Sequence, residues 1–426
     1  MMTTTTIAVI GAGIGGLSAA AALHRRGIDV HVHERGATLR EQGVGMHLGP
    51  NATRLLVRLG LGEQLAAVAV RPEALEVRAF HDGSTVAVQE MGAAWEKEFG
   101  APYLTVHRGD LHRMLASLLP SGRVHTRREL TSYEEGTKGV TLRFADGSFT
   151  RASALIGADG VHSLVRRRLV GEEKPSYSGN SALRGTVDAA DLPDLDPARM
   201  YMFAGPTGRV LLYPVSGGRQ FTYVVVVPEP EGLAESWTGA ASRDDLAAAL
   251  TGWTPQVGAL AGAAHDVRRW ALYDRPPLER WSTARTTLLG DAAHPMLPHH
   301  GQGANQAIED GVALAICLGE QRSGAAGIAA ALARYEATRR PHTTRVQLGS
   351  RDGRPTQRST QRSTQEKETD MNNNSNNNAN LNNNNNSNNN VNNQANNVAW
   401  ILANDVEANL NNNNANGNNN NLNNAA

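Results

Sequence analysis

The sequence is almost free of cysteine. Cys317 is the only cysteine among its 426 residues, and it lies in an apolar stretch with a helical pattern. A single thiol excludes a disulfide within the chain and any cysteine-rich metal site. We therefore interpret Cys317 as an inert thiol of the core, which is usual for a protein of a reducing cytoplasm.

The sequence also lacks an excess of charge of either sign and a long apolar run. Lysine plus arginine number 41, as do aspartate plus glutamate. Such a balance gives no field that would attract nucleic acid or an acidic membrane. The apolar start at Ile7 has no basic residues before it, unlike a secretory signal, and no apolar stretch is long enough to cross a bilayer. These absences predict a cytoplasmic protein with neither a nucleic-acid partner nor a membrane span.

The last part of the chain, residues 354–426, has few apolar residues. Asparagine dominates from Asn372 to the end. Such a tract buries too little apolar surface to offset its conformational entropy, so we expect it to be disordered. Self-association as β structure is the alternative for an asparagine-rich tract. One segment, Val398–Val406, is apolar enough to dock on the folded body.

What the sequence does have, at its start, is a nucleotide-binding pattern. The apolar run Ile7–Ile10 predicts a buried parallel strand, and the alanine-rich residues beyond the glycines predict a helix. Gly11, Gly13 and Gly16 have the G-x-G-x-x-G spacing that makes a tight turn, admits a pyrophosphate and packs helix on strand. A second strand ends at Glu34, whose carboxylate can accept hydrogen bonds from the ribose of an adenosine. The pattern predicts an adenine dinucleotide site, without distinguishing FAD from NAD.

Two later segments have a related form, a strand followed by an acidic residue. One strand leads to Asp159 and Gly160, where the carboxylate can either cap the next helix or bind a ligand hydroxyl. The other leads to Asp291, before a glycine-rich turn and a helix that begins near Asn305. A zinc site at Asp291 and His294 is disfavoured, because nearby prolines break any helical ligand spacing. We therefore predict no metal site.

The middle of the chain has the pattern of an antiparallel sheet. Between residues 181 and 227 strands alternate with turns, and Gly217 and Gly218 predict a hairpin. We predict an α/β protein, α+β overall, in which a Rossmann-like dinucleotide-binding domain receives an inserted, mostly antiparallel substrate domain. The first domain comprises residues 1–75, 101–178 and 276–353, and the second comprises residues 76–100 and 179–275. A last helix, Ala331–Arg340, is expected to stop at Pro341.

Together, the three acidic segments resemble one family. GAGIGG with Glu34 and Arg35, GADGVHS at 157–163, and the stretch 290–310 are similar in order and spacing to the single-component FAD-dependent aromatic hydroxylases. This group includes p-hydroxybenzoate, salicylate and 6-hydroxynicotinate monooxygenases. The resemblance covers residues 5–350 and implies bound FAD, with NADH or NADPH as a transient co-substrate. The residues that it assigns to FAD are Gly11, Gly13, Gly15, Gly16, Glu34, Arg35, His47, Arg108, Asp159, Asp291, Gly303, Ala304 and Asn305.

The resemblance also implies the reaction. A nicotinamide donates a hydride, O2 forms a flavin C4a-hydroperoxide, and a small phenolic or hydroxypyridine aromatic acid is hydroxylated. A base near the ring hydroxyl is expected, and the candidate catalytic residues are His47, Tyr213 and His299. His47 and Tyr213 resemble residues of 6-hydroxynicotinate hydroxylases, whereas the segment at Trp270 is similar to salicylate and 3-hydroxybenzoate enzymes. Each has a plainer alternative: His47 could only hydrogen-bond flavin, and Tyr213 could only fill the sheet.

Several alternatives stay open on the sequence alone. A flavin-dependent oxidase or reductase of the same fold would act on a non-aromatic substrate. A scaffold for self-association of the asparagine-rich tract would lose its assembly, but not an activity, when residues 355–426 are deleted. Arg209 could pair with a substrate carboxylate, although an exposed strand arginine is the plainer interpretation. Monomer and homodimer are both compatible with the sequence.

Overall fold

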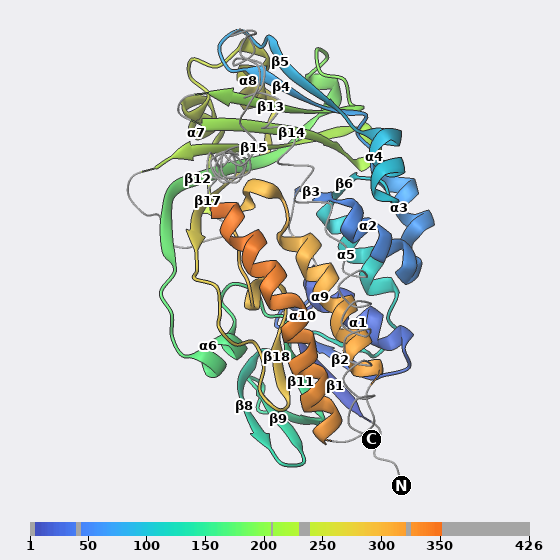
Figure 1. The fold of residues 1–426 in the computed structure, drawn as a ribbon. Coiled ribbons are helices and arrows are strands. Elements are labelled where there is room, and N and C mark those ends of the chain that lie inside the picture. Colours follow the sequence, from blue (N-terminus) through green and yellow to red (C-terminus); the bar gives the residue numbers. More distant parts are fainter. Residues whose placement is uncertain (1–4, 40–43, 206–207, 230–238, 321–324, 352–426) are drawn as a thin grey trace, which may run out of the picture.

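Two sheets of different kind organise the protein. The structure is a computed structural model, and it describes residues 5–39, 44–205, 208–229, 239–320 and 325–351. The asparagine-rich tract and Val398–Val406 therefore lie outside the described residues. A parallel sheet with its helices occupies the lower part of Figure 1, and a larger, mostly antiparallel sheet lies above it. The predicted α/β architecture with a mostly antiparallel second sheet is confirmed.

The smaller sheet has five strands, and every pair in it is parallel. Its strands come from distant parts of the chain, in the order β18 (Thr286–Leu288), β11 (Ala154–Gly157), β1 (Thr6–Ile10), β2 (Asp29–His33) and β7 (Val124–His125). The near-continuous burial of β1, β11 and β18 is typical of a parallel sheet covered on both faces. Because parallel strands end at the same edge, the segments that follow β1, β11 and β18 meet there.

Two helices pack closely beside this sheet. The helix α1 (Ile14–Arg25) follows the glycine motif, and α9 (Gly303–Gly319) lies against it. Gly311 allows this approach, since a Cβ atom at that position would lie 2.7 Å from the backbone nitrogen of Ala19. The small residues of the two helices therefore let the N-terminus of α9 come to the same edge of the sheet as the glycine motif.

The larger sheet has eight strands and two different faces. In sheet order they are β16 (Gly239–Ala240), β17 (His265–Asp274), β12 (Ser176–Asp188), β15 (Gln220–Pro228), β14 (Gly208–Val215), β13 (Arg199–Gly205), β4 (Ala74–Ala79) and β5 (Thr85–Glu90). All pairs are antiparallel except β13 with β4. One face shares a hydrophobic core with α7 (Arg243–Ala249) and α8 (Pro255–Ala263). Alternation along β14 places Val210 and Leu212 in that core and Arg209 and Tyr213 on the other face.

The remaining elements connect or border the two sheets. At Arg108 a strand passes directly into a helix. The elements are β3 (Gly45–Leu48), which pairs with β6 (Leu104–His107), then α2 (Pro50–Leu56), the π-helical turn Val57–Leu61, α3 (Gly62–Val68), α4 (Gly92–Phe99), α5 (Arg108–Ser117), the sheet of β8 (Leu130–Gly136), β9 (Gly139–Phe144) and β10 (Phe149–Ala152), and α6 (Leu164–Val170).

The last helix corrects an expectation. The prediction that it stops at Pro341 was wrong, because α10 (Ala325–Arg351) continues through the proline. Proline removes one helical hydrogen bond, and other contacts can satisfy the freed groups. Here Arg339, two residues before the proline, holds α10 against α9, since its guanidinium donates to Asp310 (2.7 Å) and Glu309 (2.6 Å). Tertiary contacts of α10 therefore outweigh the local effect of the proline.

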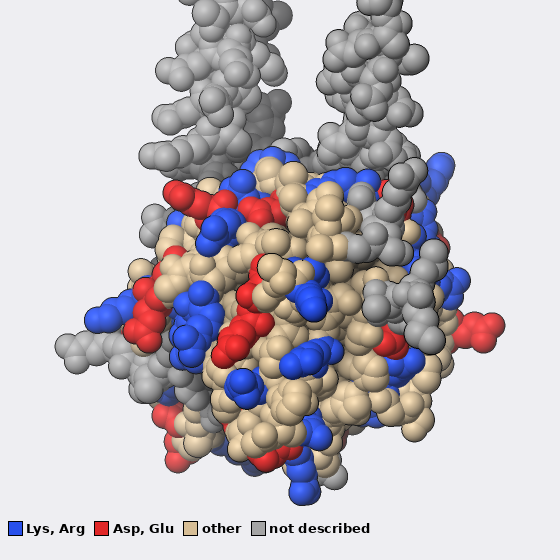
Figure 2. Space-filling view, turned by 90° about the horizontal axis from the view of Figure 1, so that it is seen from below, with Lys and Arg blue, Asp and Glu red and all other residues tan. Residues whose placement is uncertain are grey.

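The surface has charges of both signs side by side. On the face drawn in Figure 2, lysine and arginine side chains are interspersed with aspartate and glutamate rather than gathered in one patch. Within the described ranges, no helix has the length and apolar character needed to cross a membrane.

Candidate active site

A cavity of about 740 Å³ lies where the edge of the parallel sheet faces the eight-stranded sheet. Its size is that of a ligand site. Most of the residues predicted from the sequence line it: Gly11, Gly13, Glu34, Arg35, His47, Arg108, Asp159, Tyr213, Asp291, His299, Gly303 and Ala304. Gly15, Gly16 and Asn305 are not part of its lining and support it from behind. The structure thus brings segments from five distant parts of the chain to one place.

The glycine motif makes the first wall of the cavity. Gly11 has a φ of +100°, and a Cβ atom there would lie 2.4 Å from the carbonyl oxygen of Ala158. A Cβ atom on Gly16 would lie 2.0 Å from the carbonyl oxygen of Gly11. The helix α1 then begins without a side-chain cap and without an acidic residue in its first turn. Its free N–H groups and positive end therefore suit a phosphate.

Glu34 is fixed in place at the end of β2. Its carboxylate accepts hydrogen bonds from the backbone N–H groups of Ala12 (2.9 Å) and Gly36 (2.7 Å). These two bonds orient the carboxylate beside the glycine motif. Each carboxylate oxygen has a second lone pair that can accept from a ribose hydroxyl.

Asp159 has the role of a helix cap. Its carboxylate accepts from the hydroxyl of Ser163 and from the backbone N–H groups of Leu164 (2.8 Å) and Val165 (3.2 Å) at the start of α6. Burial raises the pKa of Asp159, and these hydrogen bonds oppose that shift. The capping alternative weighed from the sequence is therefore present, and the turn that it holds forms part of the cavity wall.

Asp291 and the start of α9 form the third wall. Asp291 lies in a short 3-10 turn directly after β18. The helix α9 begins at Gly303 with neither a side-chain cap nor an acidic residue in its first turn. Asn305 lies behind the lining and is fully buried. It accepts from the N–H of Gly49 (2.8 Å) and donates to the carbonyl oxygens of His47 (3.0 Å) and Gly301 (2.9 Å).

These three walls fit FAD. The uncapped N-terminus of α1 suits the pyrophosphate, and Glu34 suits the adenosine ribose. The uncapped N-terminus of α9 can face the part of a reduced flavin that carries negative charge. The first wall requires glycine at positions 11 and 16, because a Cβ atom at either position would meet backbone atoms.

His47 lines the cavity and packs against two buried tyrosines, Tyr103 and Tyr213. Its Nδ1 lies 2.9 Å from the hydroxyl of Tyr103, and its ring meets that of Tyr213 edge-on at 4.1 Å between centroids. Burial lowers the pKa of His47 to about 4, so its imidazole is neutral at neutral pH. Tyr213 donates its hydroxyl to the carbonyl oxygen of Gly45 (2.8 Å), and burial raises its pKa. This geometry favours His47 over Tyr213 as a proton acceptor.

Two arginines lie on the sheet side of the cavity. Arg184, on β12, has its guanidinium carbon 3.1 Å from the centroid of the Trp270 ring. Arg209, on β14, contacts Nδ1 of His299 through its guanidinium. Burial, together with the positive charge of Arg209, lowers the pKa of His299 to about 3. His299 is therefore a neutral acceptor beside Arg209, and Arg209 is half-buried rather than an exposed strand residue.

Some contributors were missed from the sequence. Tyr103 lies behind His47, and Arg184 and His112 line the cavity. The Nε2 atom of His112 lies 2.7 Å from the carbonyl oxygen of Ala12. His112 could have been found, since it stands four residues after Arg108 on the same face of a helix. Arg184 gives no such signal, because its role depends on which face of β12 meets the cavity.

A possible metal group lies elsewhere. Among the residues described, one set of three possible ligands comes close enough together, Asp188, Asp191 and His265. All three are exposed and outside the cavity lining. Exposed acidic groups of this kind are common without a metal ion, so the set does not bear on the cavity.

Buried histidines predict a strong pH dependence of stability. Burial lowers the pKa of His33, His47 and His342 to about 4 and that of His299 to about 3, from an ordinary value of 6.5. Between pH 6.5 and 4 the unfolded chain therefore binds more protons than the folded protein, so the free energy of unfolding falls as the pH falls. Thermal melts of the FAD-free protein should show Tm decreasing across this window. A Tm that stays constant from pH 6.5 to pH 4 would contradict the burial of these imidazoles.

Comparison with known proteins is consistent with the fit of the cavity to FAD. Residues 4–349 match the family model described as "FAD binding domain". A 3-amino-4-hydroxybenzoate 2-monooxygenase of Streptomyces platensis, PtnB3, is 44% identical over 349 residues, which cover 81% of this chain and 87% of the relative. A 6-hydroxynicotinate 3-monooxygenase of Bordetella bronchiseptica is 38% identical over 352 residues, covering 81% and 90%.

A solved structure agrees with these relatives. The structure of Klebsiella pneumoniae HpxO complexed with FAD and uric acid has a TM-score of 0.75 to this chain and is 32% identical, and the match covers 83% of this chain and 88% of that one. The predicted resemblance to FAD-dependent aromatic hydroxylases and the prediction of FAD as cofactor are confirmed.

Proposed function

The chain belongs to the FAD binding domain family and is an FAD-dependent aromatic monooxygenase; from this premise we propose that its substrate is a small aromatic acid with a ring hydroxyl, such as an aminohydroxybenzoate or a hydroxynicotinate. NADH or NADPH and O2 are the proposed co-substrates. The relatives named above act on carboxylated rings that carry a hydroxyl group. The geometry of the cavity supports the same class.

The charge on the sheet side of the cavity carries this proposal. The parallel-sheet side and its borders have charges of both signs, because Arg35, Arg108, Arg128 and Arg167 line the cavity there together with the acids. The acidic residues of its lining, Glu34, Glu129, Asp159 and Asp291, belong to the parallel-sheet side or to its borders. The lining strands of the eight-stranded sheet contribute two arginines, Arg184 and Arg209, and no acid. A carboxylate is the substrate group that two partly buried guanidinium groups bind best.

The residues of the chain have separable proposed tasks. The glycine motif, Glu34 and Asp291 hold FAD, and the start of α9 directs its positive end at the flavin ring. When bound, FAD accepts a hydride from the nicotinamide and uses O2 to deliver a hydroxyl group to the aromatic ring. The apolar side chains Leu211, Val224 and Val226 line the sheet side and exclude water from the ring.

His47 is the proposed proton acceptor for the ring hydroxyl. If Nδ1 of His47 donates to the oxygen of Tyr103, then Nε2 has the free lone pair that a base requires. Removal of the hydroxyl proton raises the electron density of the ring and prepares it for attack by an electrophilic oxygen. Tyr103 thus fixes the tautomer of the base rather than acting on the substrate itself.

The proposed function is tested by anaerobic reduction of the FAD-loaded chain with NADH or NADPH across a panel of rings. The panel contains 3-amino-4-hydroxybenzoate, 6-hydroxynicotinate, 3-hydroxybenzoate and 2-aminophenol, which lacks the carboxylate. At least one acid should accelerate flavin reduction and be hydroxylated when O2 is admitted. If NAD(P)H is consumed with hydrogen peroxide as the sole product for every ring, the oxidase alternative holds instead.

Replacement of Arg184 by glutamine should weaken binding of the acid specifically. Loss of one charged hydrogen-bond partner should raise the Kd of the carboxylated ring about tenfold or more. The Kd of 2-aminophenol should not change, because it has no carboxylate to lose. Flavin absorbance changes on titration measure both constants.

A matched control removes the same charge elsewhere. Arg219 is exposed and outside the cavity lining, so Arg219→Gln should leave both constants unchanged. If Arg184→Gln weakens both ligands equally, Arg184 shapes the cavity without recognising the carboxylate.

A further inference from the structure

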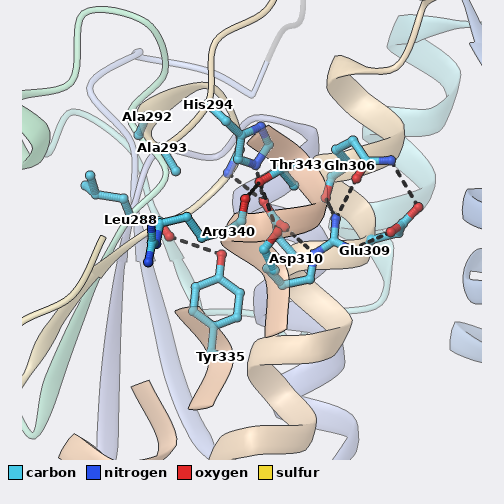
Figure 3. Close-up of polar contacts among 12 residues, drawn as sticks. Leu288, Ala292, Ala293, His294, Gln306, Glu309, Asp310, Tyr335, Arg340 and Thr343 are labelled. Carbon is cyan, nitrogen blue, oxygen red and sulfur yellow. Dashed lines mark hydrogen bonds and ion pairs between the residues drawn. The ribbon is translucent and has the colours of Figure 1, made fainter. Parts of the chain in front are cut away.

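A cluster of charged side chains is buried between α9 and α10, behind the wall of the cavity (Figure 3). We call it the Asp310 network, and its members are His294, Gln306, Glu309, Asp310 and Arg339. None of these side chains is more than 2% exposed. Buried ionised groups are rare unless they are paired.

Arg339 joins the two helices. Its guanidinium donates to Oδ1 of Asp310 (2.7 Å), to Oε2 of Glu309 (2.6 Å) and to Oε1 of Gln306 (2.7 Å). All three acceptors lie on α9, within about one turn of helix. One side chain of α10 therefore fixes both the rotation of α9 about its own axis and the position of α9 along that axis.

The second oxygen of Asp310 faces the cavity wall. Its Oδ2 accepts from the backbone N–H of Gly290 (3.1 Å) and lies 2.5 Å from Nε2 of His294. Gly290 has a φ of +59° and is followed directly by Asp291. A single carboxylate thus links Arg339 with both ends of the turn that presents Asp291 to the cavity.

The charge state of the network follows from these contacts. Burial raises the pKa of Asp310, but His294 and Arg339 together lower it to about 2. Burial of Glu309 instead prevails over its contact with Arg339, and its pKa is raised. The two neighbouring carboxyls therefore differ: the contacts of Asp310 outweigh its burial, whereas those of Glu309 do not.

Aromatic rings close the network on its remaining side. The ring of Trp281 lies 5.3 Å from that of His294 and 5.9 Å from that of Tyr335, between centroids. The hydroxyl of Tyr335 donates to the carbonyl oxygen of Leu288 (3.1 Å), at the end of β18 (Figure 3). The turn after β18 is thus held by Tyr335 of α10 and by Asp310 of α9.

We infer that Asp310 is a positioning residue for the flavin, which fixes the Gly290–Asp291 turn against the N-terminus of α9. Gly303, the first residue of α9, is close to this turn, because a Cβ atom on it would lie 3.7 Å from Oδ1 of Asp291. A change at Asp310 should displace Asp291 and the N-terminus of α9 together. The inference rests on the proposed contact of Asp291 with FAD.

The test is Asp310→Asn in the full chain. An amide cannot accept from both Arg339 and the Gly290–His294 side as the carboxylate does, so one set of bonds must be lost. The dissociation constant of FAD should rise about tenfold or more. The midpoint potential of the bound flavin should also shift, which a loss of fold stability alone would not cause.

Glu309→Gln is the matched control. It neutralises the other carboxylate that contacts Arg339, but Glu309 has no bond to Gly290 or His294 among the described contacts. Both variants should lower Tm, whereas the FAD affinity and the potential should change with Asp310→Asn alone. Equal effects of the two variants on FAD, or no effect of Asp310→Asn, would overturn the inference.

Two further variants complete the test. Asp291→Ala must weaken FAD binding on its own; if it does not, the proposed role of Asp291 fails, and the inference with it. If Asp291→Ala weakens binding while Asp310→Asn does not, the inference alone fails. Should Asp310→Asn not fold, His294→Phe keeps the contact with Trp281, removes the bond to Asp310, and must weaken FAD binding for the inference to stand.

Discussion

Replacing Gly16 with alanine is expected to abolish tight binding of FAD. The new Cβ atom would lie 2.0 Å from the carbonyl oxygen of Gly11, and this backbone atom cannot move aside as the end of a flexible side chain could. The turn must then separate from α1, which displaces the N–H groups that face the pyrophosphate. We expect the dissociation constant of FAD to rise about 100-fold, measured by flavin fluorescence during reconstitution.

The control for this variant is Gly258→Ala. Gly258 lies inside α8, where a Cβ atom would have no neighbour within 4 Å. Alanine there should stabilise the protein by about 0.5–1 kcal/mol, because glycine is unfavourable inside a helix. Retention of full flavin by Gly16→Ala would show that the glycine motif does not hold the cofactor in the way the geometry requires.

Replacing His47 with glutamine is expected to slow hydroxylation about 100- to 10,000-fold, the usual contribution of a general base. FAD should stay bound, because the backbone of residues 47–49 is held by Asn305 rather than by the imidazole. Part of the rate should return at high pH, where the ring hydroxyl of the substrate loses its proton without help. Rates of product formation at several pH values measure both effects.

The variant Tyr213→Phe distinguishes the role of Tyr213 in proton transfer from that of His47. The hydroxyl of Tyr213 donates to the carbonyl oxygen of Gly45, so its loss should reduce the rate by less than about tenfold. A larger loss with Tyr213→Phe than with His47→Gln would assign the proton transfer to the tyrosine instead.

The sequence was sufficient for the parts of the fold that depend on local pattern. The glycine spacing before α1 and the hairpin at Gly217 and Gly218 are both present as predicted. Parallel strands that end in Glu34, Asp159 and Asp291 bring those residues to one edge because of sheet geometry alone. These features needed no information about distant contacts.

Other parts could not be predicted, because they depend on contacts between distant segments. The parallel pairing of β13 with β4 joins residues more than a hundred positions apart. The helix α10 passes Pro341 because Arg339 is bound by α9. The contact between Tyr103 and His47 and that between Arg184 and Trp270 join side chains that are far apart in the sequence, and neither leaves a local signature.

The most direct measurement of the central claim is turnover of the FAD-loaded chain with NAD(P)H, a hydroxylated aromatic acid and isotopically labelled O2. The ring should gain one oxygen atom, and this atom should come from O2, as shown by mass spectrometry of the product. The Gly16→Ala and His47→Gln variants should lose this product. A protein that retains FAD and oxidises NAD(P)H, yet transfers no labelled oxygen to any ring of the panel, would contradict the account.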